Sequence, residues 1–249
     1  MKRTRNSSVP ISAVPFWHQP FGLGQLRRRH SAPLIADPLG GGTMIKPESM
    51  IACIGLLAAV ASLPIVVRGI GRRGTGEKHE SLFWVQRAPQ IAVLLNAALI
   101  VAAFELPQER MVNLFAQLPT EASGLIAWFG VAIYLSGIVF VVGGWYSLGA
   151  NFSTDAELLA DQSVTNRGFY QVVLHPVYSG VGQALFGAGL ASGSLVAVIF
   201  TALLVAPLGY RRARYEETLL ASQFGEEYRR YAESVRWRRL IPKFIPFGF

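Results

Sequence analysis

The feature that most constrains this chain is a run of 35 residues, 176–210, that contains no charged side chain. As one straight α-helix the run would be roughly 52 Å long, whereas the hydrocarbon core of a bilayer is about 30 Å thick. The run must therefore turn back on itself. A small, polar cluster near its middle, ASGS at 191–194, predicts a tight helical hairpin with two arms of about 16 residues each.

Three further uncharged runs, at 50–67, 88–104 and 122–150, precede the hairpin. Each approaches or exceeds the length of about 20 residues that spans a bilayer as a helix. The composition, with 51% hydrophobic and 15% charged residues, agrees. We therefore predict an all-α, multi-pass integral membrane protein with about five transmembrane helices, of which the last two form a tight hairpin, followed by a cytoplasmic C-terminal helix.

The positive charges of the loops predict the orientation, because loops rich in Lys and Arg stay in the cytoplasm. Residues 68–87 contain five basic residues, whereas residues 105–121 contain only Arg110. The first loop is therefore expected in the cytoplasm, the second outside, and the N-terminus outside. The hairpin then begins and ends on the cytoplasmic side, so a site at its open end would face the cytoplasm.

Residues 1–46 differ in character from the rest of the chain. They contain RRRH at 27–30, several Pro and Gly residues, and no periodic apolar face. We expect either a disordered basic tail or a segment that is not translated, with the true start at Met44 or Met50. Residues 47–144 would then form the N-terminal transmembrane helices, and residues 145–249 the part that carries recognisable motifs.

The basic balance and the cysteine content limit the partners. The formal net charge is +8, but the basic residues flank the apolar runs, so we expect contacts with anionic lipid headgroups and no nucleic-acid partner. Cys53 is the single cysteine, which excludes an intrachain disulfide and a multi-cysteine metal site. No metal is expected, and the oligomeric state stays open.

A His-Pro pair stands at the start of the hairpin. Proline disfavours helix at the residue before it and is well tolerated at the first helical position. His175 should therefore cap a helix that begins at Pro176, where free backbone N–H groups favour an anion such as a carboxylate. Tyr178 adds an aromatic face and a hydroxyl one turn later. The simpler alternative is an interfacial cap with His and Tyr side chains reaching toward water.

The second constellation is RRARYEETLLASQFGEEYRRY, residues 211–231. Its spacing makes Arg212 and Glu216, and likewise Arg214 and Glu217, pairable along one helix. The simpler alternative here is a solvated, salt-bridged cytoplasmic helix. The packing face of that helix would consist of Leu220, Phe224 and Tyr228.

The two constellations are expected to form one site, because a hairpin that returns to the same side of the membrane would place Glu216 and Glu217 near His175. A helix start can receive a carboxylate, acidic side chains can hold an ammonium group or ribose hydroxyls, and tyrosines can face a sulfonium. S-adenosylmethionine carries all of these groups, and we predict it as the cofactor.

The motifs WYSLGANFS (145–153), VTNRGFYQVVLHPVYSG (164–180), EETLLASQFGEEYRRY (216–231) and RLIPKF (239–244) resemble, in this order, the isoprenylcysteine carboxyl methyltransferases and the related membrane phospholipid methyltransferases. The resemblance covers residues 145–246. It implies S-adenosylmethionine bound beside the bilayer and a lipophilic acceptor that enters between helices. The cofactor pocket that it implies consists of Tyr170, His175, Pro176, Tyr178, Gly180, Glu216 and Glu217.

The chemistry depends on the acceptor. A carboxylate is already nucleophilic, and Arg211 or Arg214 could orient it; an amine must first lose a proton, for which Glu217 is the candidate. We predict carboxyl O-methylation of an isoprenylcysteine-like acceptor, with N-methylation of a phospholipid amine as the alternative. Leu174 stands where the family usually has Arg or Lys, which motivates a third reading, a non-catalytic membrane protein. A nicotinamide-dependent sterol reductase is a more distant possibility.

Overall fold

The computed structural model describes residues 45–70, 83–106, 112–152, 162–235, 237–238 and 241–242, all within one compact unit, residues 31–249. The predicted tail at 1–46 lies outside the described residues, except for its last two. The helices are α1 (Pro47–Ile70), α2 (Phe83–Glu105), α3 (Thr120–Leu148), α4 (Pro176–Ala191), α5 (Leu195–Phe200), α6 (Ala206–Phe224) and α7 (Glu226–Ser234), with 3₁₀ turns η2 (Gly149–Asn151) and η3 (Gly168–Gln171) and a π-helical turn η4 (Thr201–Val205). Two-residue strands β1 (Trp237–Arg238) and β2 (Ile241–Pro242) pair antiparallel.

Four helical segments in the described part are long and apolar enough to cross a membrane: Pro47–Val67, Phe83–Glu105, Thr120–Leu148 and Leu195–Phe224. The prediction of a helical, multi-pass membrane protein is thereby confirmed. The first hairpin arm is the helix α4, whose 16 residues are fewer than the roughly 20 that a spanning helix needs. The count of five spans therefore stays a prediction.

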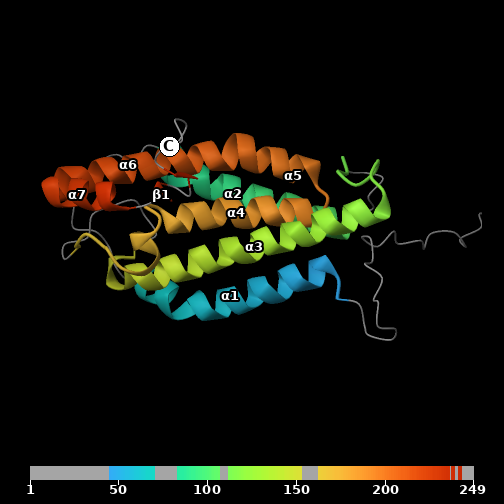
Figure 1. Cartoon of the computed structure of the whole chain (residues 1–249), viewed down its shortest axis with the longest axis horizontal. Coiled ribbons are helices and arrows are strands. Elements are labelled where there is room, and N and C mark those ends of the chain that lie inside the picture. Colours follow the sequence, from blue (N-terminus) through green and yellow to red (C-terminus); the bar gives the residue numbers. More distant parts are fainter. Residues whose placement is uncertain are drawn as a thin grey trace, which may run out of the picture. The chain divides into compact units, whose positions relative to one another are not determined.

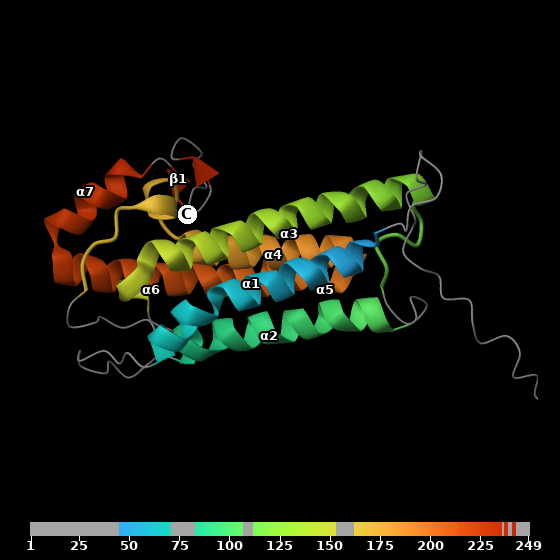
Figure 2. The same cartoon turned by 90° about the horizontal axis from the view of Figure 1, so that it is seen from below.

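Close contact between α3 and α4 forms the centre of the bundle (Figure 1). Glycines on both helices let the backbones approach, as small residues do between membrane helices. A Cβ atom built on Gly180 would lie 2.6 Å from the carbonyl oxygen of Gly137 and 2.8 Å from the backbone nitrogen of Val141. Helix α1 packs on the other side of α3, and α2 packs on α6 (Figure 2).

The chain turns between α4 and α5 at residues 192–194, where Gly193 has a φ of 68°. Ser194 caps α5 by accepting a hydrogen bond from the backbone N–H of Ala197. The turn is covered by the segment before α3, because the Leu114 N–H donates to the Gly193 carbonyl at 2.7 Å. Since α4 starts at the other end of this arm, residues 175 and 192 lie at opposite ends of the bundle.

The second hairpin arm continues much further than the sequence predicted. Helices α5 and α6 are joined through η4 into one helix that runs past Arg211 to Phe224, so no separate cytoplasmic helix begins at the arginines. Pro207 explains η4, because its missing N–H and its ring disturb the preceding turn and leave Ala206 to donate to the Thr201 carbonyl five residues back. The actual break comes at Gly225, whose φ of 52° ends α6 before α7 starts.

Candidate functional site

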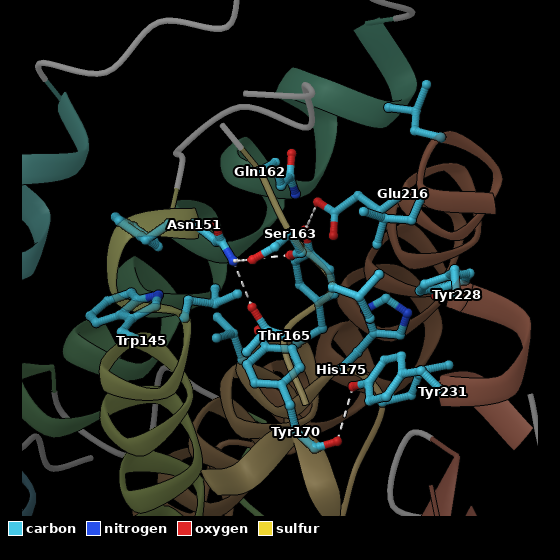
Figure 3. Close-up of a pocket in the computed structure, with 18 of the residues that line it drawn as sticks. Trp145, Asn151, Gln162, Ser163, Thr165, Tyr170, His175, Glu216, Tyr228 and Tyr231 are labelled. Atoms are coloured by element: carbon cyan, nitrogen blue, oxygen red, sulfur yellow. Dashed lines mark hydrogen bonds between the residues drawn. The ribbon is translucent and has the colours of Figure 1, made fainter. Parts of the chain in front are cut away.

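A cavity of about 360 Å³ lies at the end of the bundle where α3 ends and α4 begins. Its volume falls within the range of roughly 300–1,000 Å³ that is typical of small-molecule sites. The walls come from α2, α3, η2, residues 162–165, η3, α4, α6 and α7, so segments distant in sequence converge there (Figure 3). Polar, aromatic and aliphatic side chains share the lining.

His175 and Glu217 form a buried pair at the base of the cavity. His175 Nε2 lies 3.0 Å from Glu217 Oε1, and the two residues are 6% and 8% exposed. The second oxygen of Glu217 accepts a hydrogen bond from Arg214 Nη1 at 3.3 Å. Glu217 thus holds the imidazole in one orientation and is itself held by the half-exposed Arg214. His175 lines the cavity, whereas Glu217 lies behind it.

A second polar network faces the cavity directly. The Tyr178 hydroxyl donates a hydrogen bond to Glu216 Oε1 and accepts one from Arg212 Nε at 2.9 Å. Arg212 is 6% exposed, and its Nε lies 3.5 Å from Glu216 Oε1. Its Nη1 donates a hydrogen bond to the Gln86 carbonyl of α2 at 3.3 Å. The network therefore joins α2, α4 and α6 around one buried cation and one carboxylate.

The first turn of α4 offers a different kind of group. His175 precedes the helix in a non-helical conformation, with φ −131° and ψ 69°, and Pro176 occupies the first helical position. The histidine side chain makes no capping hydrogen bond, so the first N–H groups of the helix keep their capacity to bind an anion. Val177 and Tyr178 of this turn both line the cavity.

An extended segment, residues 162–165, forms one wall. Asn151, directly after α3, donates through Nδ2 to the Ser163 carbonyl at 3.0 Å and to Thr165 Oγ1 at 2.9 Å (Figure 3). Two residues further on, the Arg167 Nε donates to the Ser147 carbonyl at 2.8 Å. The Asn151 side chain of η2 and the Ser147 carbonyl of α3 therefore hold this wall in place, because a segment outside helices and sheets lacks regular backbone hydrogen bonds.

Aromatic side chains close the cavity on the side of α7. Tyr228, Tyr231 and Val235 pack with Leu174 in a buried cluster, and the Tyr231 hydroxyl donates to the Tyr170 carbonyl at 2.9 Å. Burial raises the pKa of Tyr170 well above its usual value, with further contributions from Glu216 and Tyr231. Burial likewise raises the pKa of Tyr231. Both phenols therefore stay neutral at physiological pH.

The structure brings the two predicted constellations together. Of the predicted cofactor residues, four line the cavity: Tyr170, His175, Tyr178 and Glu216. Three do not line it. Pro176 is buried as the first residue of α4, Gly180 packs against α3, and Glu217 lies behind His175. Both predicted pairs on α6 form, Arg212 with Glu216 and Arg214 with Glu217.

The predicted catalytic arginines lie away from the cavity lining. Arg211 is exposed, and Arg214 reaches Glu217 with a side chain that is 55% exposed. Arg212 lines the cavity instead, although the sequence assigned it only a salt bridge. Asn151 and Thr165 also line it; both lie within quoted motifs, but spacing alone could not reveal that they meet.

The helices and the cavity together define a class, a multi-pass membrane protein with a partly polar cavity at one end of its bundle. Residues 125–227 match the family model of the phospholipid methyltransferases. The match confirms the predicted resemblance and indicates a membrane methyltransferase, whose substrates would be lipophilic. It includes His175, Tyr178, Arg212 and Glu216 and ends just before Tyr228. No curated protein matches the chain significantly.

Proposed function

We propose that this protein is an S-adenosylmethionine-dependent methyltransferase that acts on a lipophilic acceptor at the membrane surface. The observation that carries the proposal is the network of Tyr178, Arg212 and Glu216 on the cavity wall. A partly buried carboxylate, a buried cation and an aromatic hydroxyl converge there on a space large enough for a small molecule.

The residues present fit the cofactor. The first turn of α4 suits its carboxylate, the Glu216 side chain suits its ammonium group or ribose hydroxyls, and the rings of Tyr170 and Tyr178 suit its sulfonium. Bound there, S-adenosylmethionine would supply an electrophilic methyl group. The protein itself would hold the two reactants in line and exclude water, which the apolar cluster beneath α7 supports.

For the acceptor we propose a carboxylate on a lipid or lipid-linked molecule, such as an isoprenylcysteine. Arg212 supports this choice, because it lines the cavity and a guanidinium group suits a carboxylate. This position makes Arg212 a better candidate for orienting the carboxylate than Arg211 or Arg214. No base is needed for a carboxylate, so the engagement of Glu217 with His175 and Arg214 is no obstacle.

The family match favours a second candidate, N-methylation of a phospholipid amine. An amine arrives protonated and must lose a proton before it can attack. Glu216 is the carboxylate on the cavity wall that could accept this proton, whereas Glu217 lies behind His175. The acceptor therefore decides between a binding role for Arg212 and a base role for a glutamate.

Leu174 does not weaken the proposal. The residue is 3% exposed and lines the cavity, and the side chains that pack against it, Tyr228, Tyr231 and Val235, are largely apolar and suit leucine. A basic residue at this position would bury a charge among these side chains at a considerable cost. The departure from the family pattern is thus matched by its neighbours, which argues against a scaffold that has lost its activity.

The test uses the purified full chain in lipid vesicles with methyl-labelled S-adenosylmethionine. An S-farnesylated cysteine and phosphatidylethanolamine serve as acceptors in parallel. Label that base treatment releases as volatile methanol identifies a carboxyl ester, whereas label in phosphatidylethanolamine that base treatment does not convert to methanol identifies an N-methylated amine. Absence of S-adenosylmethionine binding by calorimetry would refute the proposed function and return the protein to the non-catalytic reading.

A further inference from the structure

The wall formed by residues 162–165 contains a side chain whose hydrogen-bonding state can be deduced. Thr165 lines the cavity, and its Oγ1 accepts a hydrogen bond from Asn151 Nδ2 at 2.9 Å. An Asn amide nitrogen can only donate, so the threonine hydroxyl hydrogen must point elsewhere. Among the described residues, no group accepts that hydrogen.

Asn151 is well placed to impose this state. Its two amide hydrogens have two near acceptors, the Ser163 carbonyl and Thr165 Oγ1, so both are used on the same wall. The backbone at Asn151 is held in turn, because η2 follows α3 directly and the Phe152 N–H donates to the Gly149 carbonyl at 3.3 Å. The position of the threonine hydroxyl is thereby tied to the end of α3.

We propose that Thr165 binds the cofactor by donating its hydroxyl hydrogen to an acceptor atom of the ligand, and that Asn151 is the positioning residue that directs this hydrogen into the cavity. The inference rests on the proposed function and adds two residues to the site. The acceptor atom belongs either to the nucleoside part of S-adenosylmethionine or to its carboxylate.

The experiment measures S-adenosylmethionine affinity by calorimetry on the full chain in detergent. Thr165→Val keeps the shape and removes the hydroxyl, and we expect roughly tenfold weaker binding. Thr165→Ser restores the hydroxyl and should restore most of the affinity. The same variants with methylthioadenosine, which lacks the amino-acid part, locate the partner atom: a loss for both ligands indicates the nucleoside, and a loss for S-adenosylmethionine alone indicates the carboxylate.

Asn151→Asp tests the positioning role. The carboxylate has the same size but accepts hydrogen bonds, so the Thr165 hydroxyl would turn toward residue 151 and away from the ligand. We expect roughly tenfold weaker binding, and about the same loss, not a hundredfold one, when Asn151→Asp and Thr165→Val are combined. Asn151→Ala controls for the added charge and should also weaken binding.

Ser147→Ala is the matched control. It removes the hydroxyl of α3 that accepts from the Phe169 N–H of η3 at 3.2 Å, and neither residue lines the cavity. The S-adenosylmethionine affinity of Ser147→Ala should stay at the wild-type value. A loss equal to that of Asn151→Asp would mean that Asn151 only supports the local structure and does not direct the Thr165 hydroxyl. Wild-type affinity in Thr165→Val, or fully additive losses in the double variant, would overturn the inference. Failure of the wild-type protein itself to bind S-adenosylmethionine would instead refute the proposed function.

Discussion

The two adjacent glutamates of α6 should differ sharply when each is replaced by glutamine. Glu216 lines the cavity and bonds Tyr178 and Arg212, whereas Glu217 is directed to His175 and Arg214 behind the lining. Substitution by Gln keeps size and helix propensity nearly constant and removes only the charge. The pair therefore separates a direct contact with the cofactor from support of the cavity wall.

The expected magnitudes follow from these partners. A hydrogen bond to a charged group contributes about 1.5–3 kcal/mol, so Glu216→Gln should weaken S-adenosylmethionine binding by roughly 10- to 150-fold. In Glu217→Gln the amide can still form a hydrogen bond with His175 Nε2. What is lost is the ion pair with the half-exposed Arg214, which is worth about 0–1 kcal/mol, so binding should weaken by less than about fivefold.

Calorimetric titration of S-adenosylmethionine into both variants, in detergent, gives the two affinities. Thermal unfolding serves as the folding control, because Glu216→Gln also leaves the buried Arg212 without its carboxylate. Should Glu216→Gln fail to fold, Glu216→Asp retains the charge at a shorter reach and should bind weakly. Equal affinity of Glu216→Gln and wild type, or a larger loss in Glu217→Gln, would refute the assignment of Glu216 to the cofactor.

Three further predictions concern the site, the packing and the orientation. His175→Ala should weaken S-adenosylmethionine binding by about 1.5–3 kcal/mol if the imidazole bonds a charged group of the ligand, and unchanged affinity would leave His175 as a helix cap only. Gly180→Ala should lower stability by about 1–3 kcal/mol in thermal unfolding, because the new Cβ meets the α3 backbone, whereas Gly182→Ala, with open space around it, should be neutral or slightly stabilising. A Gln117→Cys probe in a Cys53→Ala background should be labelled from outside the cell, and labelling only from the cytoplasm would reverse the orientation.

Local patterns of the sequence were sufficient for most of the helices. The apolar runs correspond to α1, α2 and α3, since a segment without charges has few alternatives in a membrane. The chain also turns where ASGS stands, because a long uncharged run must bend at its most polar point. Pairs three and four residues apart on α6 were predictable because helix geometry alone makes them neighbours.

The break at Gly225 was missed, although its signal was present. Glycine followed by two glutamates is typical of one helix ending and another beginning, since Gly adopts positive φ and acidic residues favour a helix start. The motif was interpreted as one continuous helix because Leu220, Phe224 and Tyr228 keep a helical spacing. These residues do pack in one cluster, but Tyr228 reaches it from α7.

The cavity wall could not be predicted, because its contacts join distant positions without any periodic pattern. Asn151 meets Ser163 and Thr165 across a loop, and Arg212 meets the Gln86 carbonyl across 126 positions. Neighbour spacing carries no information about such pairs. The sequence therefore identified residue types that suit the cofactor, and only the fold distinguishes the arginine on the cavity wall from the arginines beside it.

The network around Arg212 is better explained by ligand binding than by stability. A buried ion pair is seldom a net gain, because removing both charges from water costs about as much as their attraction returns, and an apolar replacement is often as stable. The neighbouring buried cluster between α2 and the η4–α6 segment contains Ala88, Ala92, Val205 and Leu208, which shows that these helices can pack without charges. Arg212 is 6% exposed and bonds Tyr178 and Glu216 at the edge of a cavity. Its desolvation therefore costs free energy that packing alone does not require. Under the proposed function, this cost is explained because the network around Arg212 would bind a zwitterionic cofactor beside a charged acceptor.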